Sequence, residues 1–293
     1  MEEAKIYFTK DLTSKGLIKA YNAVGTELKG NVAVKLHSGE EGNQNFLRPE
    51  YVADLIEHVH GKVVECNTAY PGARTNNKDH IALLENHGWT KYFTVDLMDE
   101  DGDVELPIPN GKVIKTDYVG SHLLNYDSML VLCHAKGHPM AGFGNCLKQL
   151  SIGCASRRGK AYIHSAGKYQ DANVIWNDLP EQDKFLEAMA DSAGAVHNHF
   201  KGNIVYVCVM KNISVDCDCC STAEDPCMKD IGILSGTDPV ALDQAFMDFI
   251  DSSTNPGKSH FQERVNSRHG KHVIDAADEL GFGTKKYQII NLD

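Results

Sequence analysis

Four of the nine cysteines fall in one short stretch, DCDCCSTAEDPC, at Cys217, Cys219, Cys220 and Cys227. Adjacent thiols are reactive and oxidisable, so four together indicate a metal, a cluster or redox chemistry. Their spacing matches neither the paired C-x-x-C of a zinc ribbon nor the cysteine run of a ferredoxin. The stretch therefore predicts a thiolate site without specifying its metal, and the alternative is a loop of free thiols.

The ligand set of this site is incomplete in the stretch itself. Neighbouring residues of an extended chain point to opposite sides, so Cys219 and Cys220 are not both expected to bind one ion. A further ligand would come from Cys227 or from another loop, where Cys154 is the best candidate. Cys154 precedes three cations that are expected to depress its pKa and favour the thiolate, Arg157, Arg158 and Lys160. The alternative is a buried thiol beside solvated arginines.

A second candidate site is the glycine-rich segment HAKGHPMAGFGNCLK. A strand that ends in such a turn and opens a helix presents backbone amides to an anion, and Lys136 and Lys148 would reinforce that binding. We expect Gly142 and Gly144 to contact a phosphate or carboxylate; equally, these glycines only shape the turn. The G-x-G-x-x-G pattern is incomplete at Leu147, and no acidic ribose partner follows, which argues against NAD.

Polar side chains also follow predicted strands elsewhere. Lys35 and His37 follow one apolar strand, Lys136 and His138 follow another, and Arg74 comes after a third. Such groups orient a polar substrate or transfer protons. We assign Lys35, His37, Lys136 and His138 candidate catalytic roles and Arg74 a role in anion binding, while a lone histidine at a strand end is also a common structural residue.

The elements that position these groups alternate between strand and helix. Strands are predicted over 5–9, 31–37, 62–65, 92–97, 112–116, 128–133, 203–209, 230–234 and 286–292, with a further short strand just before His164. Helices are predicted over 13–24, 49–59, 80–87, 145–152, 181–200 and 261–280, with another starting at Asp238-Pro239. The acidic segment 98–111 is predicted to form a surface hairpin or connector.

This order predicts an α/β fold with largely parallel sheet flanked by helices, arranged as two Rossmann-like lobes with a cleft between them. The lobes would be 1–98 and 112–293, or one continuous domain. Ligands of such sheets lie at the carboxyl ends of the strands. The four polar loops that start at His37, Cys66, His134 and Ser214 are therefore expected to meet in one cleft.

The bulk composition is that of an ordinary globular protein, with 42% hydrophobic and 24% charged residues. The formal charge of −11 argues against a phosphate-neutralising surface for nucleic acid or an anionic membrane. The acidic start MEEAKIYF does not resemble a secretory signal, and the longest apolar run is too short to cross a bilayer. We expect a cytoplasmic protein with reduced cysteines.

At these residues the chain resembles the iron-sulfur-associated family catalogued as domain of unknown function 362. The resemblance rests on VKLHSGEEGNQNFLRPE, NTAYPGAR, HAKGHPMAGFGNCLKQLSIGCASRRGK, and DCDC followed by DIGILSGTDPVALDQA. Many relatives carry a ferredoxin-like insert after the position of His164, where this chain has AGKYQDANVIWNDLP without cysteine. The resemblance implies Cys154, Cys217 and Cys219 as cluster or metal ligands, with Cys220 and Cys227 as additional candidates.

Together these features predict a metalloprotein with an iron-sulfur cluster, of the 4Fe-4S type, or with zinc in its place. The corresponding activity is that of an iron-sulfur-dependent oxidoreductase or lyase acting on a small anionic molecule, with an electron-transfer protein as a further partner. Two alternatives are a zinc-stabilised binding module and a thiol redox sensor.

Overall fold

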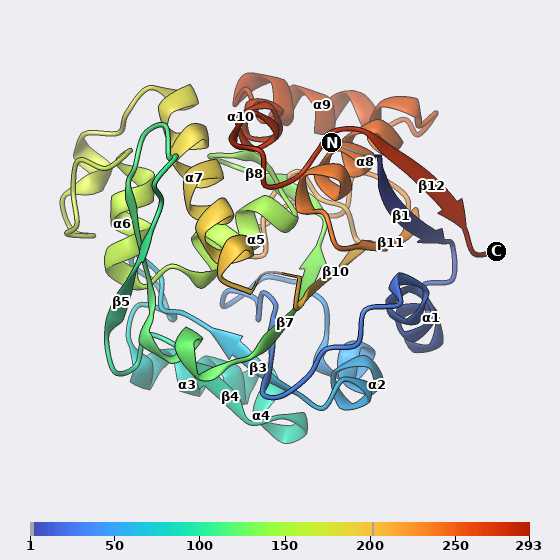
Figure 1. Ribbon diagram of the computed structural model, residues 1–293, viewed down its shortest axis with the longest axis horizontal. Coiled ribbons are helices and arrows are strands. Elements are labelled where there is room, and N and C mark those ends of the chain that lie inside the picture. The colour runs from blue at the N-terminus through green and yellow to red at the C-terminus, as the bar shows by residue number, and fades with distance from the viewer. Residues whose placement is uncertain (1–2, 201) are drawn as a thin grey trace.

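The computed structural model describes residues 3–200 and 202–293. Its central sheet has eight strands, which are β1 (Ala4–Thr9), β2 (Val32–Lys35), β3 (Gly61–Glu65), β4 (Val95–Leu97), β7 (Ser128–His134), β10 (Ile204–Met210), β11 (Gly232–Gly236) and β12 (Tyr287–Asn291). The spatial order is β12-β1-β11-β10-β7-β2-β3-β4 (Figure 1).

The sheet is mostly parallel, as the alternation of elements predicts. β10, β7, β2, β3 and β4 run parallel to one another, whereas β11 is antiparallel to both β10 and β1, and β12 runs parallel to β1. The apolar strand β7 lies between β2 and β10 and is buried along its whole length. Because β2 pairs with β7, the sheet continues across the expected boundary between 1–98 and 112–293.

Ten helices within the described ranges cover the two faces of the sheet (Figure 1). One apolar core contains side chains of α1 (Ser14–Val24), α2 (Pro49–His58), α3 (Asn77–Asn86) and α4 (Trp89–Tyr92). The core on the other face contains side chains of α5 (Cys146–Cys154), α6 (Arg157–His164), α7 (Gln182–Phe200), α8 (Pro239–Ser252), α9 (Lys258–Ser267) and α10 (His272–Leu280). Strand β7 contributes to both cores, because alternate residues of a strand point to opposite faces: Leu130 and Leu132 to the first, Val131 and Cys133 to the second.

Two small antiparallel hairpins stand beside the main sheet. They pair β5 (Asp103–Pro107) with β6 (Thr116–Gly120), and β8 (Lys136–His138) with β9 (Gly142–Gly144). The predicted surface hairpin over 98–111 therefore supplies one strand, β5. The predicted strand over 112–116 is wrong, because the backbone amides of Lys112, Val113 and Ile114 donate to the carboxylate of Asp191 instead of to a strand, at 2.7, 2.7 and 2.9 Å.

Two other predictions are corrected at helices. His164 does not follow a strand but ends α6, which begins after Ser156, whose side chain accepts from the amide of Gly159 at 3.0 Å. The single helix predicted over 261–280 is broken into α9 and α10 where His269 takes a positive φ of 49°.

The predicted start of α8 is confirmed. The Asp238 carboxylate accepts from the amides of Val240 and Ala241, both at 2.9 Å, and Pro239 occupies the first helical position. Within the described part of the chain, no helix has the length and apolar character needed to span a bilayer.

Candidate functional site

The loops after β2, β3, β7 and β10 meet at the carboxyl edge of the parallel strands and enclose a pocket of about 260 Å³. Each loop supplies part of its wall, and the prediction that the four loops converge is confirmed. The residues expected at this site that line it are Lys35, His37, Arg74, His138, Lys148, Cys219 and Cys220.

Two of the cations in this wall are paired. The Nζ atom of Lys35 lies 2.6 Å from Glu65 Oε2, and Nε of Arg74 lies 3.2 Å from Glu40 Oε2. The Arg74 guanidinium also donates to the Tyr70 hydroxyl at 2.6 Å. Burial alone would raise the pKa of Glu65, but Lys35, His37 and Arg74 hold it well below its usual range. The charges of Lys35 and Arg74 are therefore already neutralised by Glu65 and Glu40.

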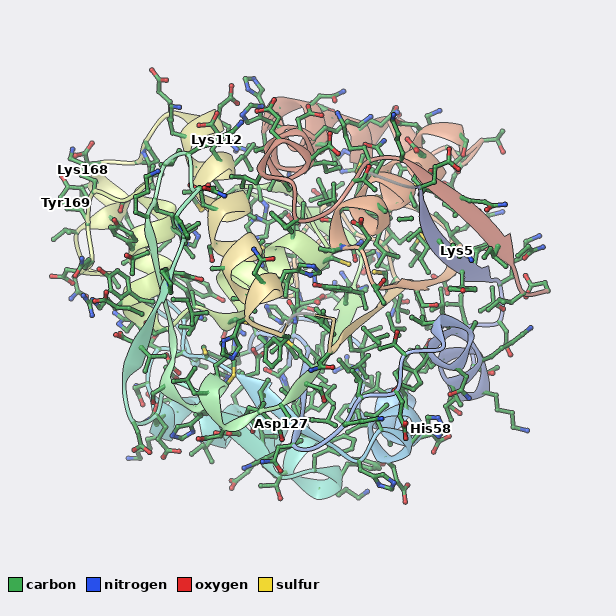
Figure 2. The ribbon with its side chains drawn as sticks, in the orientation of Figure 1. Lys5, His58, Lys112, Asp127, Lys168 and Tyr169 are labelled. Carbon is green, nitrogen blue, oxygen red and sulfur yellow. The ribbon has the colours of Figure 1, made fainter. Side chains whose placement is uncertain are left out.

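Two other buried lysines in the wall lack such partners. In residues 3–200 and 202–293, no carboxylate oxygen lies within 4.0 Å of the Nζ atom of Lys148 or Lys160. Nζ of Lys160 donates to the carbonyl of Ala155 at 2.5 Å, and burial lowers its pKa. Most lysines of the chain are instead exposed or half-buried, among them Lys5 and Lys112, which Figure 2 labels. The pocket thus presents positive charge that the protein does not balance with a carboxylate.

Two buried hydrogen-bond donors of the wall are also without partners. Nε2 of Gln149 and Nε1 of Trp176 are buried and have no hydrogen-bond acceptor among residues 3–200 and 202–293, although both residues line the pocket. A buried donor without an acceptor is costly, so these atoms indicate a ligand that offers acceptors. The rest of this wall includes the apolar side chains of Pro139, Met140 and Ile152.

The cysteine loop forms a tight turn at the edge of the pocket. The amide of Cys220 donates to the carbonyl of Cys217 at 2.9 Å, and the sulfurs of Cys217 and Cys219 lie with a ring nitrogen of His138 in a group whose ligand atoms are all within 4.8 Å of one another. Burial alone would raise the pKa of Cys217, but the Cys219 thiol, Lys148 and His138 hold it well below its usual range. The contact with Cys217 raises the pKa of Cys219. The turn therefore pairs a thiolate with a thiol.

His138 and His164 face the pocket as opposite tautomers. Nδ1 of His138 accepts from the amides of Met140 and Ala141, at 3.1 and 2.9 Å, so the neutral ring carries its proton on Nε2, which lies 3.8 Å from Cys219 Sγ. Nδ1 of His164 donates to the carbonyl of Lys160 at 2.7 Å, which leaves a lone pair on Nε2. Burial lowers the pKa of both rings, that of His164 to about 4. The pocket thus offers one imidazole N–H and one imidazole lone pair.

This tautomer decides the part that His138 can play. A metal at Nε2 would require that nitrogen to lose its only proton while Nδ1 still accepts two amides, which leaves an imidazolate. His138 is therefore placed to donate to a sulfur, and an ion in this group would be held by Cys217 and Cys219.

The other cysteines expected as ligands lie in different places. Cys220 also lines the pocket but is not part of the three-residue group, which agrees with the expectation that Cys219 and Cys220 do not both bind one ion, although the chain turns here and is not extended. The thiol of Cys227 donates to the carbonyl of Ile213 at 3.4 Å. Neither residue belongs to the group formed by His138, Cys217 and Cys219.

The structure does not bring Cys154 to the cysteine turn. Cys154 ends α5, its sulfur lies 3.8 Å from the carbonyl oxygen of Gln149, and it is not part of the three-residue group. The expected depression of its pKa is also wrong, because burial raises that pKa to about 12. The neighbouring Arg157 and Arg158 turn elsewhere, to the carbonyl of Thr68 at 2.6 Å and to the carboxylate of Asp103 at 3.1 Å.

Lys136 holds the cysteine turn in place. Its Nζ atom lies 2.9 Å from the carboxylate of the buried Asp218, which also lies 2.9 Å from Nδ1 of His134. Burial would raise the pKa of Asp218, but His134 and Lys136 hold it well below its usual range. Lys136 does not line the pocket, so its position is that of an anchor and not of the expected catalytic group.

Asn43 fixes the same turn from the loop after β2. Its Nδ2 atom donates to the carbonyls of Cys217 and Cys220 at 3.3 and 2.9 Å, and its Oδ1 atom accepts from the amides of Asn45 and Phe46 at 2.9 and 3.1 Å. Nδ2 thus joins the two loops, and Oδ1 fixes the turn of the loop to which Asn43 itself belongs.

The glycine-rich segment does not form the expected anion site. Gly142 and Gly144 do not line the pocket, and the amides of Cys146 and Leu147 at the start of α5 donate to the carboxylate of Asp243 at 2.9 and 3.2 Å. The anion at the start of α5 is thus a carboxylate of the protein itself, that of Asp243. A Cβ atom on Gly142 would lie 2.8 Å from Cα of Gly270, so the alternative in which the glycines shape the turn fits the structure.

Sequence reasoning did not place Gln149, Lys160 or Trp176 in the pocket, and His164, which also lines it, was not among the expected site residues. None stands in a recognisable motif, and the one available signal was the short distance along the chain between Gln149 and Lys148, which places both on α5. Trp176 lies between α6 and α7, where only the folded chain shows that it reaches the pocket.

The fold and the pocket define an α/β protein with a thiol-containing, cationic pocket at the carboxyl edge of its sheet. The chain belongs to the family described as domain of unknown function (DUF362), whose model matches residues 32–248. No curated protein matches the sequence.

Two solved structures are similar in part. One is the lactate racemase apoprotein from Thermoanaerobacterium thermosaccharolyticum, with 12% identity, a TM-score of 0.45, and 84% of this chain and 57% of that one covered. The other is a protein from Thermotoga maritima, with 10% identity, a TM-score of 0.43, and 69% and 52% covered. The matched part of this chain spans little more than half of either protein.

Proposed function

We propose that this protein is an enzyme that binds a small anion in the pocket and acts on it at a metal ion held by the sulfurs of Cys217 and Cys219. The observation that carries the proposal is the pair of buried lysines, Lys148 and Lys160, which face the pocket without a carboxylate partner. Burying such charge is unfavourable unless it is compensated. The sulfur of Cys217 lies 3.6 Å from Nζ of Lys148 but would be shared with the metal ion, so an anionic ligand supplies the remaining compensation, chiefly at Lys160.

The ligand class follows from the other groups of the wall. Gln149 and Trp176 add neutral donors, so the charged end of the ligand is expected to be a carboxylate or phosphate with several acceptor oxygens. Met140, Pro139 and Ile152 face the same space and would contact an apolar body. A small carboxylic acid or phosphate ester with a short apolar part satisfies both requirements.

The sulfur atoms favour a single ion over a cluster. Sulfurs that bind one tetrahedral ion at about 2.3 Å lie roughly 3.8 Å apart, which agrees with ligand atoms that are all within 4.8 Å. The 4Fe-4S cluster expected from the sequence needs cysteines on separate irons, and Cys154 is not at hand to supply one. With two thiolates as ligands, the ion keeps open positions, where it would act as a Lewis acid on an oxygen of the bound anion.

The chain's own residues would move the protons. His138 holds a proton on Nε2 beside the sulfur of Cys219, and His164 presents the lone pair of Nε2 to the pocket. We assign His138 the role of proton donor and His164 the role of acceptor for a hydroxyl or water of the ligand. The paired cations Lys35 and Arg74 line the same pocket.

Metal analysis tests the proposal. Protein purified anaerobically should contain close to one equivalent of zinc or iron, and Cys217→Ser and Cys219→Ser should each abolish it. Cys154→Ser is the matched control, because it removes an equally buried thiol outside the group and should leave the metal content unchanged. Wild-type protein that takes up no stoichiometric metal, even after reconstitution, would contradict the proposal.

A second candidate function is a thiol redox pair, which the contact between the Cys217 thiolate and the Cys219 thiol favours. A peroxide would oxidise the thiolate, and attack by the second thiol would release water and leave a disulfide. Titration of free thiols before and after mild peroxide treatment distinguishes this candidate, since a metal-bound pair should keep both thiols.

A further inference from the structure

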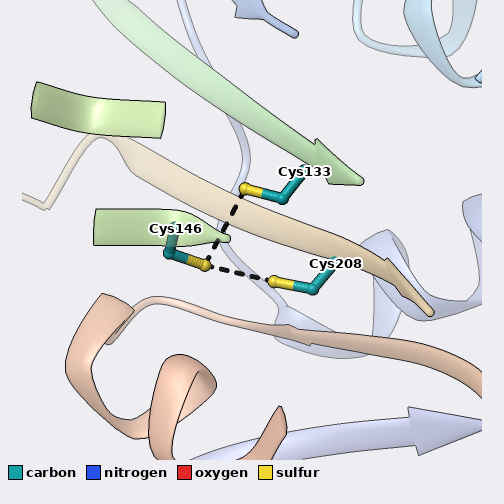
Figure 3. A group of neighbouring side chains, drawn as sticks. All are labelled: Cys133, Cys146 and Cys208. Atoms are coloured by element: carbon teal, nitrogen blue, oxygen red, sulfur yellow. Dashed lines mark hydrogen bonds between the residues drawn. The ribbon is translucent and has the colours of Figure 1, made fainter. Parts of the chain in front are cut away.

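A second group of sulfurs lies in the core, among residues that do not line the pocket. Cys133, Cys146 and Cys208 are all free and buried, and their sulfurs lie within 4.8 Å of one another. The Cys146 sulfur is 3.1 Å from that of Cys208 and 3.9 Å from that of Cys133 (Figure 3). Buried cysteines commonly act as small apolar side chains, each packed on carbon. Here the three sulfurs contact one another instead.

The fold fixes this arrangement from three separate elements. Cys133 on β7 and Cys208 on β10 are direct partners in the register of the two parallel strands, so both side chains project from the same face of the sheet. Cys146 is the first residue of α5, which packs on that face, and Asp243 on α8 fixes its backbone by accepting from its amide at 2.9 Å. The three sulfurs are therefore brought together by the framework of the sheet and not by a mobile loop.

We propose that Cys133, Cys146 and Cys208 form a buried site for one thiophilic metal ion. Monovalent copper is the ion whose coordination three sulfurs complete. Sulfur ligands select soft ions over hard ones. Three sulfurs at about 2.3 Å from a central ion lie roughly 4 Å apart. The distance between the Cys133 and Cys146 sulfurs, 3.9 Å, agrees with this, whereas the Cys146 and Cys208 sulfurs, 3.1 Å apart, would have to separate when the ion binds. Zinc in a structural site requires a fourth ligand, and no further Cys, His, Asp or Glu of the described residues joins this group.

The experiment uses the full chain carrying Cys217→Ser and Cys219→Ser, which lacks the sulfurs of the pocket turn. Anaerobic titration with monovalent copper against a chromophoric competitor should show one equivalent bound. X-ray absorption at the copper edge should then show three sulfur neighbours and no nitrogen or oxygen ligand. This second measurement needs no substitution in the core, so it does not depend on a core variant that folds.

Two further variants in the same background assign the ion to the cluster. Cys146→Ala should lose the bound copper while its far-ultraviolet circular dichroism stays native, and Cys154→Ala, which removes a buried thiol elsewhere, should retain it. The proposal is overturned if the starting variant binds no copper, if copper survives Cys146→Ala, or if the isolated protein contains a disulfide between Cys146 and Cys208. Because the pocket cysteines are absent throughout, these outcomes are independent of the proposed function.

Discussion

The Nζ atom of Lys148 lies 3.6 Å from the sulfur of Cys217, and the same lysine lines the anion pocket. Lys148 thus lies beside the sulfur of Cys217 and also beside the space in which the ligand would bind. Its position on α5, one residue before Gln149, ties the two parts of the site to one rigid element.

Lys148→Met should move the thiol–thiolate equilibrium of Cys217 at least roughly tenfold toward the thiol, because an opposite charge at this distance stabilises the thiolate. The pH dependence of thiolate ultraviolet absorbance measures it, with Cys217→Ser used to assign the difference signal. Lys148→Arg keeps the charge and should restore most of the effect. An unchanged titration in Lys148→Met would show that the thiolate does not depend on this lysine.

Lys160→Met should weaken the binding of a small anion about ten- to one-hundred-fold, since hydrogen bonds to charged groups contribute about 1.5–3 kcal/mol. Calorimetric titration with inorganic phosphate and with short-chain carboxylates measures the dissociation constants. Lys15→Met, which removes an exposed lysine of α1, is the control and should bind like the wild type. Equal affinity in Lys160→Met and the control would refute an anion site at this lysine.

Asp218→Asn should destabilise the protein by about 3 kcal/mol or more, because it leaves Lys136 and His134 buried without their carboxylate. Urea unfolding followed by circular dichroism measures the loss. Adding Lys136→Met should recover part of the stability, since the uncompensated charge is then removed as well. Simple additivity of the two changes would show that the pair is not coupled.

The stability of the protein should depend on pH through the titration of Asp117. Burial raises the pKa of this carboxyl to about 7, and its Oδ1 atom has no hydrogen-bond partner. Between its ordinary pKa and about pH 7, the folded chain keeps the proton that the unfolded chain has lost, so its contribution to stability falls as the pH rises through that window. Above it both states are ionised and the contribution is constant.

Through this group, the wild-type protein should lose about 2 kcal/mol of stability between roughly pH 5.5 and 8.5, and Asp117→Asn should not show that loss. Urea unfolding at the two pH values measures it, and Asp54→Asn, at an exposed position on α2, is the control. If the pH dependence of Asp117→Asn matches that of the control, the carboxyl does not titrate as described.

Sequence patterns predicted the parts of this protein that follow local rules. The apolar run of β7, the Asp238-Pro239 start of α8 and the succession of strand and helix are set by side-chain periodicity and capping, and the structure agrees with them. The convergence of the loops also followed, because parallel strands bring their carboxyl ends to one edge.

The errors arose where distant residues decide the structure. Asp191 captures the backbone amides of a predicted strand, and Asp243 occupies the helix end that was expected to bind a ligand. Cys154 is adjacent in sequence to arginines that turn away from it. The trio around Cys146 was not foreseen, since the pairing of Cys133 with Cys208 depends on strand register, which single strands do not specify.

The four hydrogen bonds of Asn43 have a consequence for ion selection. Because this side chain already holds the carbonyls of Cys217 and Cys220, the turn needs little rearrangement to receive an ion. A rigid donor pair discriminates by ionic radius and preferred bond angle, whereas a flexible one adapts to whatever ion arrives. In the proposed metal site, discrimination at Cys217 and Cys219 would thus be set by a neutral amide on a neighbouring loop that does not touch the ion.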